Sequence, residues 1–205
     1  DTILPSQYYI NLIRANDAWD ITTGDPNIVI GITDTGWEPT HPDLLANVKI
    51  NVNDPINGID DDGDGYIDNN MGWDLGSDDN DATWESAFHG VNVTGLAAAV
   101  TDNVTGIAGV GFNTRFMPIK ISNPTGVLTQ AYQGIVYAAD HDCFIINCSW
   151  GSFSFSQFSK DVVDYATINK GCLVVGAVGN NNLETIFYPA GYQGVLSVAN
   201  SNQSD

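Results

Sequence analysis

Short apolar runs alternate with helical patterns along most of the chain, and this alternation constrains the fold more than any other feature. Continuous apolar, β-branched segments predict buried strands at residues 28–33, 115–121, 143–148, 173–178 and 195–198. Amphipathic or apolar periodicity predicts helices at residues 91–100, 127–140 and 155–169. We therefore expect an α/β fold, with a parallel sheet, right-handed crossovers and helices on both faces.

The segment between the first two strands has a different character. Residues 37–88 are mostly loop, and ten of the 22 Asp residues lie between Asp54 and Asp81. A connection of this length with little regular structure is either functional or held by ligands. The first 27 residues read as an N-terminal arm with a short helix, and the whole of 1–205 reads as a single domain.

Acidic residues dominate the charge of the whole chain. Six Lys and Arg against 25 Asp and Glu give a formal net charge of −19. Nucleic acids and anionic membrane surfaces both require a basic face, so the charge argues against either as a partner. In addition, no apolar run approaches the ~18 residues that are needed to span a bilayer.

Polar residues follow three of the predicted strands directly. Asp34 ends the first strand, residues 147–151 end the third, and Gly179 and Asn180 follow the fourth. Ligands of open parallel sheets bind at the carboxyl ends of the strands. These residues are therefore the first candidates for a functional site.

Three segments, taken in order and spacing, resemble the subtilisin-like serine proteases. They are residues 29–36 (VIGITDTG) followed by HPDL at 41–44, residues 89–98 (HGVNVTGLAA), and residues 174–180 (VVGAVGN). Weaker similarities occur at 106–110 (GIAGV), 147–151 (NCSWG) and 188–190 (YPA). The resemblance covers nearly the whole chain and implies a subtilisin-like fold for an endopeptidase that acts on polypeptides through an acyl-enzyme.

The resemblance implies a role for three residues. Asp34 would orient an imidazole and stabilise its protonated form, and His89 would be the general base that activates a serine hydroxyl. The order Asp, His, Ser along the chain is the subtilisin order. Asn180 would donate its side-chain amide to the oxyanion of the tetrahedral intermediate.

Two departures from the family pattern shape this expectation. The family usually has His-Gly-Thr-His at the catalytic histidine, whereas residues 89–92 read HGVN. The family motif Gly-Thr-Ser-Met-Ala, which carries the nucleophile, is absent from these 205 residues. We expect a further C-terminal segment to supply the serine, so that this chain alone is inactive. The alternative is a catalytically silent, subtilase-like binding or scaffold domain.

By the same resemblance, Ser149, Trp150 and Gly151 wall the pocket for the substrate residue that precedes the scissile bond. Subtilisins often have Gly just before Tyr-Pro, whereas this chain has Phe187. A phenyl ring there would fill the space for a large substrate side chain. We therefore expect a preference for small residues such as Ala, unless Phe187 points outward or into the core.

The densest acidic segment, residues 60–68 (DDDGDGYID), has the spacing of a calcium loop. Carboxylates at positions 1, 3, 5 and 9 and a backbone carbonyl at position 7 match an EF-hand count, although Met71 stands where the closing Glu would be. A solvated acidic turn, or a calcium-dependent interaction module, would explain the same loop. The predicted Ca²⁺ ligands are Asp60, Asp62, Asp64, Tyr66 and Asp68.

A second calcium ligand is implied by the resemblance alone. Asp43, within HPDL, matches a calcium ligand of the family, and Gln7 is its expected partner.

The three cysteines and the chain ends bear on the compartment. Cys143, Cys148 and Cys172 have no CxxC spacing, so buried free thiols are expected, and a Cys143–Cys172 bridge stays open. The chain starts at Asp1 without Met or a signal peptide, which suggests a piece of a larger precursor. With the resemblance, this predicts a secreted enzyme with a pro-peptide.

Overall fold

A parallel sheet lies at the centre of the computed structural model, which describes residues 6–202; Asp1, where the sequence suggests a piece cut from a larger precursor, lies outside this range. Its strands run in the order β2-β3-β1-β4-β5-β6, and every neighbouring pair is parallel. The strands are β1 (Val29–Asp34), β2 (Trp73–Asp74), β3 (Arg115–Lys120), β4 (Ile145–Cys148), β5 (Leu173–Ala177) and β6 (Leu196–Val198). This confirms the predicted α/β class.

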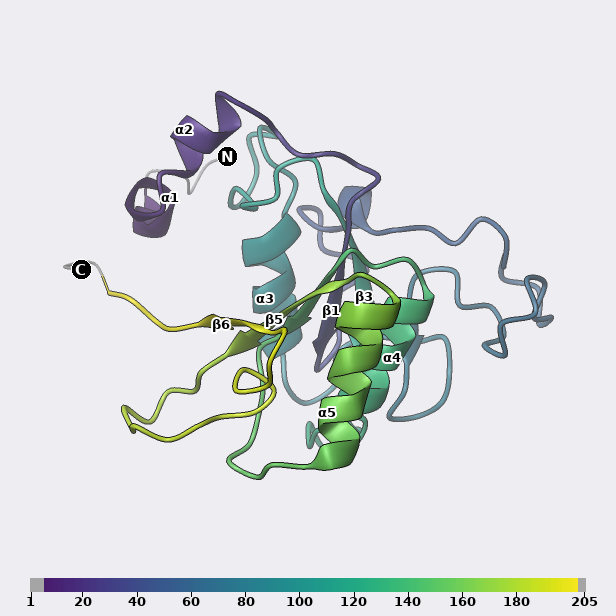
Figure 1. The fold of residues 1–205 in the computed structure, drawn as a ribbon. Helices are drawn as coiled ribbons and strands as arrows, with labels where there is room; N and C mark the ends of the chain where they lie inside the picture. Colours follow the sequence, from purple (N-terminus) through teal and green to yellow (C-terminus); the bar gives the residue numbers. More distant parts are fainter. Residues whose placement is uncertain (1–5, 203–205) are drawn as a thin grey trace.

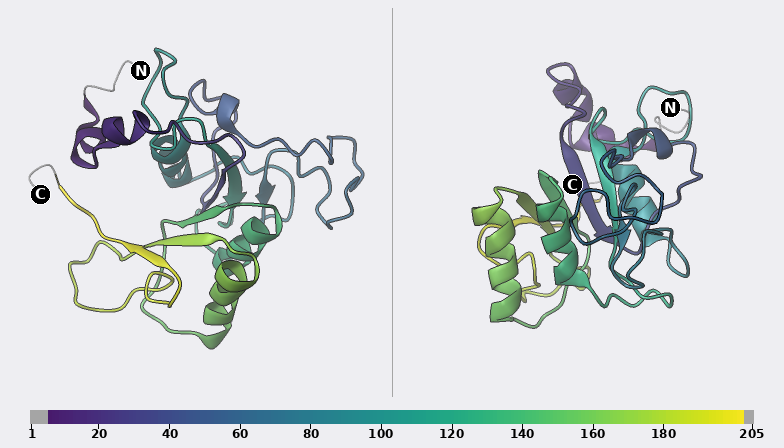
Figure 2. Two further views of the ribbon diagram at one scale, coloured as in Figure 1. Left: turned by 45° about the horizontal axis from the view of Figure 1, so that its top comes forward. Right: turned by 90° about the vertical axis from the view of Figure 1, so that its right-hand side faces the viewer.

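Helices cover both faces of the sheet (Figures 1 and 2). One face carries α3 (His89–Ala98), and the other carries α4 (Ala131–Asp140) and α5 (Gln157–Asp164). The remaining short elements are α1 (Tyr8–Leu12), α2 (Ala15–Trp19), η2 (Leu45–Asn47) and the π-helical turn η3 (Tyr165–Asn169). The N-terminal arm therefore holds two short helices where the sequence predicted one.

Strand β1 lies in the interior of the sheet, between β3 and β4, and both of its faces are apolar. All six of its residues are buried, and the side chains alternate between two hydrophobic clusters. Ile30 and Ile32 pack in the cluster on the α3 side. Gly31 faces α4, where a Cβ would lie 3.0 Å from the Cβ of Ala138. Burial on both faces explains why this strand reads as a continuous apolar run.

Two helices begin later than the sequence pattern predicts. The loop 122–130 replaces the first turn of the predicted helix, and the Asn123 carboxamide oxygen accepts hydrogen bonds from the backbone of Thr125 and Val127. Helix α5 begins at Gln157, because Ser156 has an extended conformation and its hydroxyl accepts a bond from the Ser159 backbone. In each case a local side-chain bond outweighs apolar periodicity.

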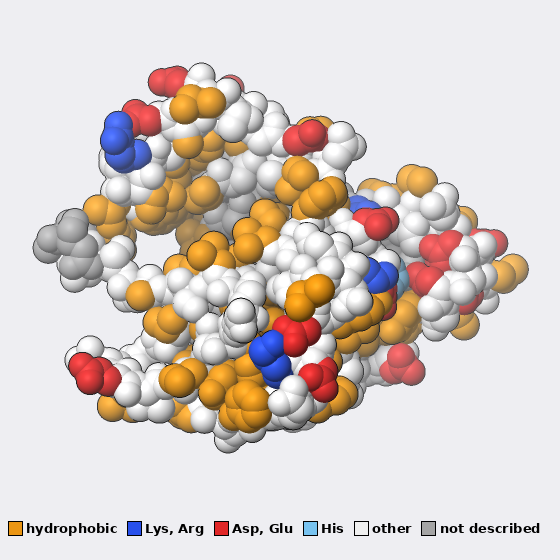
Figure 3. Space-filling view, in the orientation of Figure 1, with side chains coloured by type: hydrophobic (Ala, Val, Ile, Leu, Met, Phe, Trp, Pro, Cys, Tyr) orange, Lys and Arg blue, Asp and Glu red, His pale blue; other side chains and the backbone are white. Residues whose placement is uncertain are grey.

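The acidic segment projects from the body of the molecule. Residues 50–70 contain no helix or strand and extend to the right in Figure 1. Figure 3 shows Asp and Glu side chains gathered over this projection.

One face of the sheet is open at its β5–β6 end. Val175 pairs in register with Leu196, and Ala177 with Val198, so these side chains share the face that α3 covers further along the sheet. Leu173, Leu196 and Val198 are 44%, 52% and 48% exposed. Figure 3 shows hydrophobic side chains lining a hollow between the N-terminal arm and this edge. Within residues 6–202, no helix is both long and apolar enough to cross a membrane.

Candidate active site

Asp34 and His89 form a hydrogen-bonded pair at the carboxyl end of β1. The His89 Nδ1 lies 2.8 Å from Oδ1 and 3.0 Å from Oδ2 of Asp34. The Asp34 side chain is 4% exposed, whereas the His89 side chain is 57% exposed. The pair thus joins a buried carboxylate to an imidazole that is open to solvent.

The start of α3 brings His89 to this position. His89 is the first residue of α3, and Phe88 caps the helix without a side-chain hydrogen bond. The Gly90 backbone N–H donates instead to Thr35 Oγ1 at 3.0 Å. A Cβ on Gly90 would collide with the Gly36 carbonyl and lie 3.1 Å from the Asp34 Cβ. Only glycine at position 90 allows the helix to approach β1 this closely.

The pairing changes the proton affinity of the imidazole. The hydrogen bond that His89 donates to the Asp34 carboxylate raises the pKa of His89 above its ordinary value of 6.5, and partial burial opposes this effect. Because Nδ1 is engaged by Asp34, Nε2 is the nitrogen that remains to accept a proton. This is the arrangement of a general base that is oriented by a carboxylate.

The segment after β4 lies beside this pair, since β4 is the neighbour of β1 in the sheet. The Trp150 indole points inward, is 9% exposed, and donates from Nε1 to Thr33 Oγ1 at 2.9 Å. The Thr33 hydroxyl in turn donates to the Asn147 carbonyl at 2.7 Å. Trp150 therefore anchors the segment, and the backbone of Ser149 and Gly151 remains as the accessible part.

Asn180 follows β5, two strands away from Asp34. At about 4.8 Å per strand, the backbones of β1 and β5 are roughly 10 Å apart. Asn180 is exposed and borders a pocket of about 570 Å³, with Val178, Leu183 and Asn200 among its lining residues. Asp34 and Asn180 thus lie at or just beyond the carboxyl ends of β1 and β5, and His89 contacts Asp34 from the start of α3.

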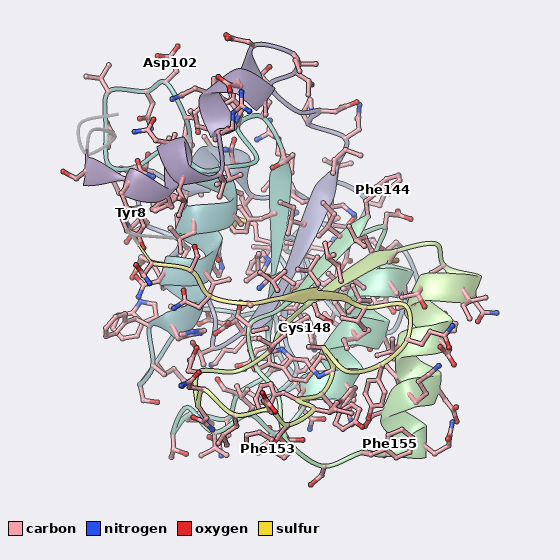
Figure 4. All side chains as sticks on the ribbon, turned by 60° about the vertical axis from the view of Figure 1, so that its left-hand side comes forward. Tyr8, Asp102, Phe144, Cys148, Phe153 and Phe155 are labelled. Atoms are coloured by element: carbon pink, nitrogen blue, oxygen red, sulfur yellow. The ribbon has the colours of Figure 1, made fainter. Side chains whose placement is uncertain are left out.

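The Phe187 ring fills the space between the segments that follow β4 and β5. A Cβ on Gly151 would lie 2.5 Å from its Cε1, and a Cβ on Gly179 would lie 3.5 Å from its Cδ1. Phe153 packs edge-on against it at 5.1 Å between ring centroids. Ser152 and Tyr188 hold the two segments together by mutual backbone hydrogen bonds of 2.8 Å. Figure 4 shows Phe153 and Phe155 at the opposite end of the sheet from Phe144.

The acidic loop brings together part of the predicted calcium set and one residue that the pattern missed. Carboxylate oxygens of Asp54, Asp60 and Asp62 lie within 4.8 Å of one another. Asp54 is fully buried, and its two oxygens accept backbone hydrogen bonds from Asp61 and Asn69, both at 2.8 Å. Asp54 lies six residues before the motif and therefore outside the EF-hand count. The signal that identifies it as part of the cluster is its burial.

The other three predicted ligands of this loop make different contacts. Asp64 Oδ2 lies 2.8 Å from the His141 Nε2, and Asp68 accepts backbone hydrogen bonds from Asn57 and Gly58. The Tyr66 ring packs edge-to-face against the aromatic rings around it, namely those of Trp73, Tyr137 and His141.

Asp43 and Gln7 meet a different loop. The Asp43 carboxylate accepts hydrogen bonds from the Asn103 side chain at 2.7 Å and from the Ile107 backbone at 2.9 Å. Gln7 pairs with the backbone of Ala108 through bonds of 2.8 and 2.9 Å. Both residues therefore contact the loop 103–108 through hydrogen bonds, and their predicted role as calcium ligands stays a prediction.

The three cysteines are free, buried thiols. Burial raises the pKa of Cys143 and of Cys148 to about 12, so both are protonated at neutral pH. Cys148 is the last residue of β4 and lies near the middle of the molecule (Figure 4). The open alternative of a Cys143–Cys172 bridge is not the state found here.

Comparison with known proteins agrees with this geometry. The chain is 38% identical to a thermophilic serine proteinase of Bacillus sp. strain AK1, over 92% of this chain and 42% of that protein. It is 35% identical to thermitase of Thermoactinomyces vulgaris, over 97% of this chain and 63% of that protein. A protease structure from Pseudoalteromonas arctica superposes with a TM-score of 0.73 at 27% identity, covering 91% of this chain and 59% of that one.

The chain thus spans about two fifths to three fifths of the length of these relatives. The sequence model of the subtilase family matches residues 25–205. This match includes every residue of the pair and of the surrounding strand ends, and the chain belongs to the subtilase family.

Proposed function

We propose that the protein is a serine endopeptidase in which this chain supplies the orienting carboxylate, the general base and the oxyanion donor. The observation that carries the proposal is the 2.8 Å contact between the buried Asp34 carboxylate and the exposed His89 imidazole. Membership of the subtilase family supports it.

In the proposed reaction, the Nε2 of His89 removes the proton from a serine hydroxyl as that oxygen attacks the peptide carbonyl. Asp34 holds the tautomer in which Nδ1 carries the hydrogen, and it stabilises the imidazolium that forms. The imidazolium then protonates the leaving amine, which leaves an acyl-enzyme. Water, activated by the same imidazole, hydrolyses the ester and restores the serine.

Asn180 would stabilise the negative charge that develops on the carbonyl oxygen. Its exposed position at the strand ends leaves the side-chain amide available to a bound substrate. Losing one donor of this kind costs about 2.7–4 kcal/mol of transition-state stabilisation, a value established on subtilisin itself.

A further segment of the longer protein would supply the serine. Two features support this part of the proposal: the greater length of the relatives and the open sheet face at Leu173, Leu196 and Val198. Parallel sheets are normally covered on both faces, so a packed segment there would complete the core. That segment would pass close to the pocket beside Asn180.

The acidic loop is the proposed Ca²⁺ site. Asp54, Asp60 and Asp62 supply an all-oxygen set of carboxylates, which suits a hard cation. Bound Ca²⁺ would offset the mutual repulsion of these carboxylates and stabilise the loop. A second site at Asp43 and the loop 103–108 remains a proposal by resemblance.

Exposure of the loop also supports a proposal of secretion. Asp62 is exposed and Asp60 is half-buried, so the site is shared with solvent. Extracellular modules typically bind Ca²⁺ with dissociation constants of about 10⁻⁴–10⁻³ M, and a site of this modest affinity is filled only where the Ca²⁺ concentration is as high. We propose an extracellular enzyme whose partners are polypeptide substrates and a pro-peptide.

The test uses the intact protein that contains this chain. Hydrolysis of a peptide substrate and labelling by a fluorophosphonate, both lost in the His89→Ala variant, are expected. Labelling without dependence on His89 would contradict the mechanism. A folded protein with neither activity nor labelling would instead favour the silent binding or scaffold domain.

A further inference from the structure

Lys120 is a buried cation in a chain that has only six Lys and Arg residues. Its side chain is 2% exposed, although lysine is almost never fully buried unless it is paired. The Nζ lies 2.8 Å from Asp74 Oδ2 and 2.6 Å from Glu85 Oε2. These carboxylates hold the pKa of Lys120 above its ordinary value, against the desolvation that would lower it.

The two partners belong to different parts of the fold. Asp74 ends β2, is buried, and uses its other oxygen to accept backbone hydrogen bonds from Gly76 and Ser77. Glu85 lies four residues before His89, in the segment that leads into α3, and its side chain is 44% exposed. Lys120 therefore links the end of β2 to the segment that leads into α3.

Lys120 also lies beside the other member of the catalytic pair. It is in register with Asp34 across the β1–β3 pairing, and the next residue, Ile121, donates its N–H to the Asp34 carbonyl at 2.9 Å. The segment that leads into α3, residues 82–88, is held at its start by backbone hydrogen bonds between Trp37 and residues 82 and 84. The Glu85 contact is the last side-chain anchor described before Phe88, which caps α3 without a side-chain bond.

We propose that Lys120 is a positioning residue, which holds Glu85 so that α3 begins with His89 directed at Asp34. The inference rests on the proposed role of His89 as the base. The proposal predicts how strong the Asp34–His89 hydrogen bond is, and this can be measured without enzyme turnover. Failure of the positioning role can therefore be distinguished from failure of the proposed function.

Simple electrostatics predicts a different outcome, and this allows the two explanations to be distinguished. The charged group that faces the imidazole is Asp34, and Lys120, with its partners Asp74 and Glu85, is in register with Asp34 on the next strand. Removing the Lys120 charge would make the surroundings more negative and raise the His89 pKa. Loss of positioning would weaken the Asp34 hydrogen bond and lower the pKa toward 6.5.

The experiment is an NMR titration of the intact protein with labelled histidine, in which His89 is assigned by its loss in His89→Gln. Glu85→Gln keeps an acceptor for Lys120, whereas Glu85→Ala does not, and both remove the same charge. Lys120→Met tests the cation, and Lys160→Met, which breaks a half-buried pair with Asp164 on α5, is the matched control.

We expect Glu85→Ala to lower the His89 pKa more than Glu85→Gln does, and to speed exchange of the Nδ1 proton several-fold. Lys120→Met should lower the pKa as well, and Lys160→Met should leave it unchanged. Equal shifts in the two Glu85 variants, or a raised pKa in Lys120→Met, would overturn the proposal. If Lys120→Met does not fold, the two Glu85 variants decide the question.

Discussion

The Phe187 ring gives the sharpest prediction about substrate choice. It occupies the space between Gly151 and Gly179, the two glycines whose missing side chains would otherwise leave room for a substrate side chain. A large residue before the scissile bond would have to displace the ring. We therefore expect the intact enzyme to cleave after Ala faster than after Phe.

The magnitude follows from the packing. Forcing extra bulk into a filled site costs about 1–3 kcal/mol, which corresponds to a roughly 5- to 150-fold change in kcat/KM. Phe187→Gly removes the whole ring, so the ratio of kcat/KM for Phe over Ala substrates should rise by a factor in this range. A Cβ added to Gly151 or Gly179 would lie only 2.5 or 3.5 Å from the ring, so the ring already occupies the space beside both glycines.

The assay compares two peptides that differ only at the residue before the scissile bond. Phe155→Ala is the matched control, because Phe155 packs on Tyr188 and Tyr192 and not between the glycines. A melting curve for each variant ensures that lost packing has not unfolded the protein. Faster wild-type cleavage after Phe, or an unchanged ratio in Phe187→Gly, would refute the filled-pocket explanation.

Three further predictions concern the catalytic pair and the acidic loop. His89→Ala should lower kcat/KM by about four to six orders of magnitude with an unchanged fold, as measured by peptide hydrolysis and circular dichroism. Because the base must be neutral, kcat/KM should rise with pH through a midpoint above 6.5, and Asp34→Asn should lower that midpoint by removing the main cause of the shift. Chelation should lower Tm by about 5–10 °C if Ca²⁺ is present at ~100 times its Kd, and an unchanged Tm would exclude the site.

The sheet could be predicted because its signals are local, whereas Asp34 and His89 are singled out by motifs that resemble those of the subtilisin-like proteases. A strand that is buried on both faces reads as a continuous apolar run, and β1 shows this along its whole length. Asp34 ends this strand, so placing the strand also places its carboxylate. The start of α4 could not be predicted in this way, because Val127 and Leu128 continue the apolar period through a loop.

The missed features depend on contacts between distant parts of the chain. Asp54 joins Asp60 and Asp62 through the path of the loop, which no spacing rule describes. Lys120 meets Glu85 across 35 residues. Nothing in the local sequence of Lys120 distinguishes it from an exposed lysine, since its burial results from the position of β3 between β2 and β1.

Within residues 6–202, the clustered carboxylates of the acidic loop lack Lys or Arg partners, because the chain has few such residues. Among the described residues, the ion pairs bring no Lys or Arg to Asp54, Asp60 or Asp62, and backbone N–H groups satisfy Asp54 and Asp60 instead. Backbone donors orient these oxygens but bring no full positive charge, so the repulsion between the carboxylates remains. The loop is also attached to α4 through the contact between Asp64 and His141. Because the sheet and the catalytic pair do not depend on this loop for their hydrogen bonds, removing a bound cation should loosen residues 50–70 before it disturbs Asp34 and His89.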